Sequence, residues 1–284
     1  MTEFLEHEGG RIAYDVTGEG PLVVLAHGMG DGRRAYRFLV PHLVAAGYRV
    51  ASLDLRGHGE SSTGWPSYTR VDVAGDLLAL IRHLGGGPAV IVGHSFSGGA
   101  ATLAAVRAPE LVGAVVEIGP FTRAQKIDLP GLLRVARHRK GMLRLLAAGA
   151  LGSVGMWKRY LDVAYPGVRP ADHAGYIAAL EADLRRPGRM KVITKMGGSP
   201  PADAGAVLGR IPCPALVVMG TLDPDWAAPE AEADGIVAAM PEGRGRVVMI
   251  DGAGHYPHAQ YPDEVAAAVL PFLKESSGPK EGNG

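Results

Sequence analysis

A serine at position 95 stands where the sequence changes from one structural pattern to another. Residues 90–93 form an apolar run typical of a buried strand, and an alanine-rich segment typical of a helix follows the serine. Gly93 and Ser97, two places before and after Ser95, are small enough for a tight strand–turn–helix that holds the serine in a strained conformation. The helix N-terminus then lies beneath developing negative charge. Ser95 is therefore the predicted nucleophile.

A second candidate segment, residues 27–30, follows an apolar run at 21–26. Glycines at a strand end let the backbone turn sharply and present N–H groups to an anion. The backbone amides of Met29 and Phe96 are the predicted oxyanion hole. His27 and Gly28 are candidate substrate-binding residues, and His27 is expected to act as a structural hydrogen-bonding residue rather than as a base. A phosphate-binding loop is disfavoured because neither common glycine spacing follows a strand here.

The general base is expected late in the chain. His255 follows an apolar run at 246–250 and a glycine-rich turn, and an imidazole can accept and return the serine proton near neutral pH. His258 is the alternative base and a candidate substrate-binding residue, but the glycines before His255 favour His255. Pro257 and Pro262 are expected to end any helix near this loop.

Two carboxylates follow the apolar run at 215–219 and compete for the acid that orients the base. Asp223 is nearer the strand end and better placed to hold the imidazole tautomer. Asp225 is expected to be a loop acid or a helix cap, and Glu117 is a third choice. No cofactor and no metal site are predicted.

Apolar runs alternate with helix-like segments along most of the chain, which predicts an α/β fold with a mostly parallel, doubly wound sheet. Residues 71–84 carry apolar side chains at helical spacing, and residues 3–8 and 11–16 are expected to pair as a hairpin at the sheet edge. We predict the other strands at 21–26, 48–53, 89–92, 112–118, 215–219 and 246–250.

The alternation stops between residues 121 and 203, where helix-like stretches predict a cap over the strand ends. The core is then 1–120 and 204–274, and the polar tail 275–284 is expected to be disordered. In the cap, Met142, Met156 and Trp157 are candidate residues of an apolar substrate pocket.

The formal net charge is zero, which argues against a nucleic-acid partner. Residues 121–203, however, carry 15 Lys and Arg and 6 Asp and Glu, a net charge of +9 that the rest of the chain balances. The simpler interpretation is that a basic cap neutralises an acidic core. The alternative is attraction of an anionic or carrier-bound acyl substrate, such as a carboxylated acyl group, an acyl-coenzyme A or an acyl carrier protein, by Arg134, Arg137, Arg139, Lys140 and Arg144.

Cys213 is the single cysteine, so no internal disulfide is expected. The first residues lack the basic start and apolar run of a signal peptide, and no apolar run approaches the length of a membrane span. These features predict a cytoplasmic protein without a membrane partner, and they leave its oligomeric state open.

These motifs resemble the α/β-hydrolase superfamily over about residues 3–274, in its serine-nucleophile branch with a helical cap. The resemblance lies in five segments in the expected order, with serine, acid and histidine in sequence, and it implies that the loop 54–61 is architectural. Epoxide hydrolases and haloalkane dehalogenases carry aspartate where Ser95 stands, so both activities are disfavoured. The segments are 27–30, 54–61, 93–98, 220–223 and 254–255.

The resemblance implies hydrolysis of a carboxylic ester, lactone or thioester through an acyl-enzyme. A carbon–carbon bond hydrolase, or a lyase or transferase using the same serine, is the alternative. Ser97 stands where most members carry glycine, and serine also occurs there in the branch of plant karrikin and strigolactone receptors. A slow-turnover ligand sensor is therefore a further alternative.

Overall fold

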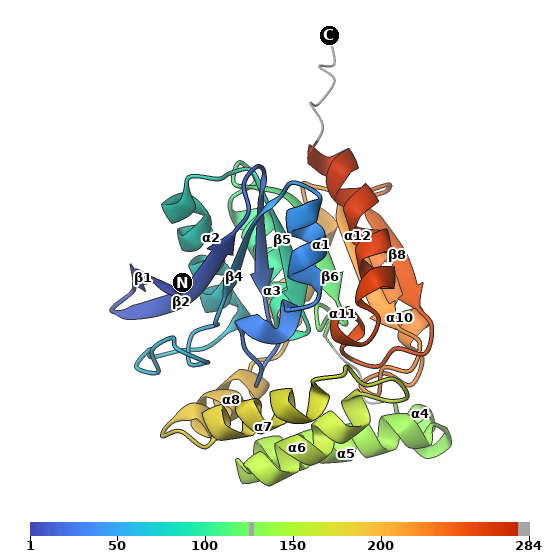
Figure 1. Ribbon diagram of the computed structural model, residues 1–284. Helices are drawn as coiled ribbons and strands as arrows, with labels where there is room; N and C mark the ends of the chain where they lie inside the picture. Colours follow the sequence, from blue (N-terminus) through green and yellow to red (C-terminus); the bar gives the residue numbers. More distant parts are fainter. Residues whose placement is uncertain (125–127, 278–284) are drawn as a thin grey trace.

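The computed structural model describes residues 1–124 and 128–277 and contains one eight-stranded sheet (Figure 1). The strand order is β1-β2-β4-β3-β5-β6-β7-β8, and the pairs from β4 to β8 are parallel. The α/β fold and the doubly wound, mostly parallel sheet predicted from the apolar runs are confirmed. The strands are β1 (Glu3–His7), β2 (Gly10–Thr17), β3 (Leu22–Ala26), β4 (Arg49–Leu53), β5 (Ala89–His94), β6 (Val112–Ile118), β7 (Ala215–Gly220) and β8 (Gly245–Ile250).

The first two strands form the predicted antiparallel hairpin, with β1 at the edge of the sheet. The central strands are buried along their whole length, as continuous apolar runs require when helices cover both faces. Parallel registers such as Ala26 opposite Gly93, and His94 opposite Ile118, bring the carboxyl ends of β3, β5 and β6 level with one another. The loops that carry the candidate site residues therefore leave the sheet at the same edge.

Helices cover both faces of the sheet. One face packs against α1 (Leu39–Ala45) and α12 (Pro262–Ser277), and the other against α2 (Arg70–Leu84), α3 (Phe96–Arg107) and α10 (Pro229–Ala238). Pro257 and Pro262 are the first residues of α11 (Pro257–Gln260) and α12, so both prolines begin helices, although α11 does end just before Pro262 as expected. Proline fits a first helical turn because its N–H has no intrahelical acceptor there.

The described residues between β6 and β7 form six helices, which make up the cap, and Figure 1 shows α4 to α8 gathered at one end of the sheet. The last of the six crosses the predicted boundary at 203, and residues 125–127 lie outside the described residues. They are α4 (Leu129–Arg134), α5 (Ala136–Leu151), α6 (Val154–Ala164), α7 (His173–Leu184), α8 (Arg189–Gly197) and α9 (Ala202–Gly205). Two short 3₁₀ helices, Arg33–Tyr36 and Leu208–Arg210, lie in the core.

The C-terminal helix is longer than the predicted core. Helix α12 extends to Ser277, so the prediction of disorder is wrong for residues 275–277, and residues 278–284 lie outside the described part of the chain. Among the described helices, none has both the length and the apolar content needed to cross a membrane.

Candidate active site

The turn between β5 and α3 holds Ser95 in a conformation that few residues adopt. Its backbone has φ 54° and ψ −115°, a strained combination for a residue with a side chain. A Cβ at Gly93 would collide with the carbonyl oxygen of Ser97, and one at Gly98 would lie 2.7 Å from Cβ of Pro120. The sequence folds this way because glycine leaves room for the sharp turn, which raises Ser95 above the sheet edge.

The loop after β3 lies directly against this turn. A Cβ at Gly28 would lie 2.8 Å from Nδ1 of His94 and 3.0 Å from Cβ of Ser95, so only glycine permits the approach. Met29 and Phe96 both line the cavity that Ser95 faces. Within the part of the chain that the structure describes, neither backbone amide donates a hydrogen bond. The two N–H groups are therefore available to a negatively charged oxygen in the cavity.

His27 and Gly28 support this loop from behind and do not line the cavity. Nε2 of His27 accepts a hydrogen bond from the backbone N–H of Leu55 (3.0 Å), and Nδ1 donates to the carbonyl oxygen of Gly28 (2.7 Å). Burial, with repulsion from His58, holds the His27 pKa well below its usual value. The expected contact of His27 and Gly28 with substrate is therefore absent, because the loops that these residues support cover both of them.

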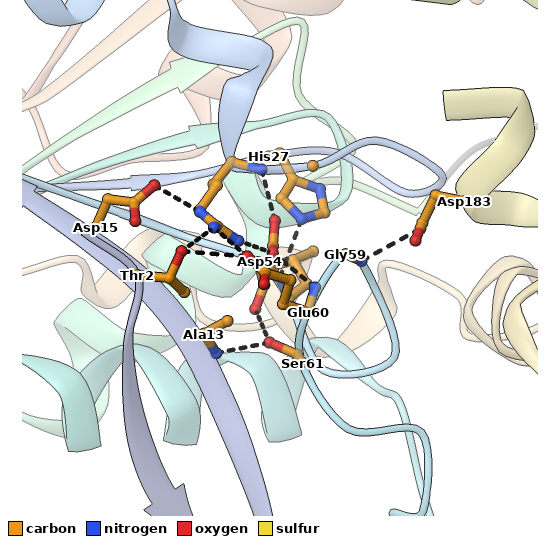
Figure 2. A network of polar contacts seen from close by, with 12 residues as sticks. Thr2, Ala13, Asp15, His27, Asp54, Gly59, Glu60, Ser61 and Asp183 are labelled. Carbon is orange, nitrogen blue, oxygen red and sulfur yellow. Dashed lines mark hydrogen bonds and ion pairs between the residues drawn. The ribbon is translucent and has the colours of Figure 1, made fainter. Parts of the chain in front are cut away.

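The loop 54–61 has the architectural role that the resemblance implied, and Figure 2 shows the polar network around it. Asp54 accepts hydrogen bonds from the guanidinium and the backbone amide of Arg33. Ser61 donates to the carbonyl oxygen of Asp54 (2.7 Å). Farther along the loop, Nε2 of His58 accepts from the backbone N–H of Gly30 (3.0 Å), directly beside the candidate oxyanion donor.

Ser97, the departure from the usual glycine, is explained by a local contact. Its hydroxyl donates a 2.6 Å hydrogen bond to the carbonyl oxygen of His27 and is fully buried. The hydroxyl therefore ties the first turn of α3 to the loop that carries Met29, and it does not face the cavity.

The loops after β7 and β8 bring two carboxylates to His255. Nδ1 of His255 donates to Oδ2 of Asp223 at 2.9 Å, and Oδ2 of Asp225 lies 3.3 Å from the same nitrogen. Asp225 also accepts a 2.7 Å hydrogen bond from the hydroxyl of Tyr160, and its backbone N–H donates to Asp223. Asp223 thus makes the closer contact, and Asp225 is a loop acid, as expected, that also contacts His255. Glu117, the third choice, instead accepts hydrogen bonds from two threonine hydroxyls.

The paired carboxylates determine the electrostatics of His255. Burial opposes protonation of the ring, but attraction to Asp223 and then to Asp225 outweighs it and raises the His255 pKa to about 9. Burial, opposed by attraction to His255, raises the pKa of Asp225 to about 6. The arrangement strongly favours an imidazolium, which is the species that forms when the base takes a proton from a nucleophile.

The substitution Asp225→Asn is expected to move the pH dependence of kcat/KM. A general base acts when neutral, so kcat/KM of the wild type should rise with pH as His255 loses its proton. Removing the second carboxylate weakens the stabilisation of the imidazolium, lowers the His255 pKa and shifts this limb to lower pH by about one unit. Rate profiles between pH 5 and 10 measure the shift.

Glu117→Gln is the matched control for that profile. Glu117 is a buried carboxyl whose pKa burial raises to about 7, and it makes its hydrogen bonds with Thr102 and Thr122 rather than with His255. Its replacement should leave the limb in place. An unchanged limb in Asp225→Asn, or a shift to higher pH, would show that Asp225 does not act on His255.

The loop that carries His255 is fixed to both the core and the cap. Nε2 of His94 donates to the carbonyl oxygen of His255 (2.8 Å), and the backbone N–H of His255 donates to the carbonyl oxygen of Ala164 in α6 (2.9 Å). The side chain of Gln260 adds bonds to the carbonyl oxygens of Pro166 and Val168, both 2.7 Å. The cap and the candidate base are therefore held as one unit.

His258, the alternative base, lies behind this loop. It is fully buried, its ring centroid is 4.8 Å from that of Tyr36 and 4.7 Å from that of His94, and burial lowers its pKa to about 3. It does not line the cavity, so neither the alternative base nor the substrate contact that we expected for it is present.

A cavity of about 480 Å³ lies between the cap and the strand ends, and both Ser95 and His255 line it. Met142 and Trp157 line it as expected for the cap residues, whereas Met156 does not. Met156 lies outside the inner face of α6, and its sulfur is in contact with Arg159. Most of the wall is apolar, so the cavity suits an acyl chain or another apolar group.

The sequence pattern did not reveal several polar residues of the cavity, among them Arg70, Tyr160 and Tyr256, and the smaller polar side chains of Thr194 and Ser199 also line it. Tyr160 and Arg70 lie in helices far from the sequence motifs. Tyr256 follows His255 directly, but nothing in its type distinguishes it from a core tyrosine. Their positions depend on how the cap packs on the core, which no local signal reports.

The five basic cap residues considered for an anionic substrate lie outside the cavity. The guanidinium groups of Arg137, Arg139 and Arg144 donate to backbone carbonyl oxygens. Among the described residues, Arg123 with Glu232 is the one ion pair between a cap base and a core acid. Direct pairing therefore accounts for little of the charge balance between cap and core.

Asp223, Asp225 and His255 are also the one group in the described ranges whose side chains could together hold a metal ion. Their ligand atoms lie within 4.8 Å of one another. Nδ1 of His255 and Oδ2 of both aspartates take part in the contacts among the three residues and Tyr160. These contacts are those of a histidine held by two carboxylates.

Comparison with known proteins agrees with this fold. The alpha/beta hydrolase family model matches residues 23–268. The chain is 26% identical over 270 residues to 2-(acetamidomethylene)succinate hydrolase of Mesorhizobium japonicum, a match that covers 93% of this chain and 92% of that relative. It is 36% identical over 116 residues to epoxide hydrolase B of Mycobacterium tuberculosis, which is 40% of this chain and 33% of that relative.

Among solved structures, a meta-cleavage product hydrolase from Pseudomonas fluorescens has the same fold, with a TM-score of 0.77 at 20% identity. The superposition covers 97% of this chain and 98% of that one. The family match extends over far more than half of the 284 residues. The chain therefore belongs to the alpha/beta hydrolase family and is an enzyme of hydrolase type.

Proposed function

We propose that the protein is a serine hydrolase that cleaves a carboxylic ester, lactone or thioester through an acyl-enzyme. The observation that carries the proposal is the 2.9 Å hydrogen bond between Asp223 and His255 at a cavity that Ser95 also lines. His255 takes the proton of the Ser95 hydroxyl as the oxygen attacks the substrate carbonyl. Asp223 holds the ring orientation and stabilises the imidazolium.

The negative charge that develops on the carbonyl oxygen is placed between the backbone N–H groups of Met29 and Phe96. The tetrahedral intermediate then collapses, and His255 gives its proton to the leaving group. In the second half of the reaction His255 takes a proton from water, which attacks the acyl-enzyme, and then gives that proton to Oγ of Ser95 as the acid is released. Each step uses groups that line the cavity or that hold His255.

The test is a panel of 4-nitrophenyl esters, lactones, thioesters and 1,3-diketones of graded length, assayed with the wild type and with Ser95→Ala. An ester, lactone or thioester should be turned over at about one per second or faster, the rate of ordinary enzymes. Cleavage of diketones alone would establish carbon–carbon bond hydrolysis instead. Turnover far below that rate on every member, with tight binding of one of them, would favour the ligand sensor.

A further inference from the structure

Arg70 places a positive charge at the cavity wall, where the surroundings disfavour it. It is the first residue of α2, and a cation there opposes the partial positive charge of the helix N-terminus. The residue is 4% exposed, and it lines the same cavity as Ser95 and His255. It comes from the core, unlike the cap arginines that the charge count singled out.

The contacts of Arg70 fix its position without neutralising it. Nη1 donates a 2.8 Å hydrogen bond to the carbonyl oxygen of Ser199, and Cζ lies 4.1 Å from the ring centroid of Phe96. A Cβ at Gly99 would lie 2.9 Å from Cδ of Arg70, so glycine there leaves room for the side chain. The guanidinium is thus held against the ring of Phe96, the residue next to the nucleophile, and its edge is free to bind a ligand.

Among the described residues, this charge has no counter-ion in contact with it. Over the described ranges 1–124 and 128–277, no carboxylate lies within ion-pair distance of Arg70, and its buried Nε has no hydrogen-bond partner. Arg56 shows the usual alternative: its guanidinium, equally buried, makes two 2.7 Å bonds to Asp76 and reaches Glu8.

Burial lowers the pKa of Arg70 to about 10, and the more distant Asp203 opposes this shift only in part. The guanidinium therefore keeps its charge at neutral pH. A buried charge without a partner destabilises a fold, and a bound anion would remove that destabilisation. Five N–H donors in one plane match a carboxylate particularly well.

We propose that Arg70 binds a carboxylate of the substrate, so that the preferred substrate is an ester or thioester that carries a carboxylate apart from its scissile carbonyl. The inference rests on the proposed function for its turnover assay, but its binding assay is independent of turnover. The basic residues of the cap surface are not part of this subsite, because they lie outside the cavity.

The turnover assay compares two pairs of esters that differ in charge and are nearly equal in length. Mono-4-nitrophenyl adipate and its methyl ester place the carboxylate on the acyl side, and 3-acetoxybenzoate and its methyl ester place it on the alcohol side. The wild type should prefer the charged member of one pair by about tenfold or more in kcat/KM. Arg70→Met should lower kcat/KM for that charged ester by about 30-fold or more, mainly through KM, and change the neutral ester less than threefold.

Two further variants separate binding from structure. Arg70→Lys keeps the charge and should restore part of the preference. Arg139→Met removes a cap guanidinium that donates to Leu132 and Leu133 outside the cavity, and should leave the preference unchanged. Equal losses on charged and neutral esters in Arg70→Met would show that Arg70 only anchors Ser199, and would overturn the proposal. So would a wild type without preference in either pair.

The binding assay keeps the inference distinct from the proposed function. Calorimetric titration of adipate into Ser95→Ala should show binding that Ser95→Ala/Arg70→Met lacks, whereas 1,6-hexanediol should not discriminate between the two proteins. If no ester is hydrolysed but adipate binding depends on Arg70, the proposed function fails and the carboxylate subsite stands. If esters are hydrolysed but adipate binds both proteins equally or neither, the subsite fails and the proposed function stands.

Discussion

Ser95→Ala is expected to lower kcat by on the order of 10⁵- to 10⁶-fold, to the background rate of the assay. The substitution removes the oxygen that attacks the carbonyl, and the neighbouring Ser97 cannot replace it because its hydroxyl is buried and bonded to the carbonyl oxygen of His27. KM for a surviving substrate should change little, because the cavity and both oxyanion donors remain. Burst kinetics with a 4-nitrophenyl ester measure both effects.

The backbone around Ser95 should tolerate this change. Alanine has the same cost as serine at φ 54°, and the Ser95 hydroxyl makes no hydrogen bond within the described residues. The thermal midpoint of Ser95→Ala should therefore stay within about 3 °C of the wild type. Ser97→Ala is the control, since it removes a neighbouring hydroxyl on the same helix turn. Ser97→Ala should lower the free energy of unfolding by about 1 kcal/mol and decrease kcat only modestly.

Asp223→Asn is expected to lower kcat by on the order of 10⁴-fold. The carboxylate accepts the Nδ1 proton of His255 at 2.9 Å, which leaves Nε2 free to take the serine proton. An amide in its place can donate to Nδ1 and hold the wrong tautomer, and it no longer stabilises the imidazolium. Rates measured at saturating substrate separate this effect from binding.

Asp225→Asn should lower kcat far less than Asp223→Asn does, by on the order of tenfold. Asp225 lies 3.3 Å from Nδ1 and shares its oxygen with the hydroxyl of Tyr160, so it adds charge without determining the ring orientation. Both variants replace a carboxylate near Nδ1 of His255 by an amide of nearly the same size, which makes them a matched pair. A larger loss in Asp225→Asn than in Asp223→Asn would reverse the assignment of the acid.

The fold and the positions of Ser95, Asp223 and His255 follow from local sequence patterns. Buried parallel strands are continuous apolar runs, and the sharp turns at their ends need glycine at positions such as Gly93 and Gly28. Because parallel strands end at one edge, residues just after them converge even when more than a hundred positions separate them. The sequence patterns that predict each site residue therefore lie within a few residues of it.

The features that were missed depend on contacts between the cap and the core. Met142 lines the cavity and Met156 does not, because the rotation of each cap helix selects the inward face. Tyr160 meets Asp225 only when α6 lies over the acid loop. Arg70 begins a helix whose pattern is that of any amphipathic segment, and its lack of a carboxylate partner appears only in three dimensions.

The central claim, that Ser95 is the nucleophile, is tested most directly by covalent labelling with a fluorophosphonate followed by mass spectrometry. The tryptic peptide 83–107 contains both Ser95 and Ser97, so fragmentation must locate the adduct. We predict one adduct, on Ser95, formed in the wild type and in Ser97→Ala and absent from Ser95→Ala. An adduct on another residue, or undiminished labelling of Ser95→Ala, would contradict the assignment.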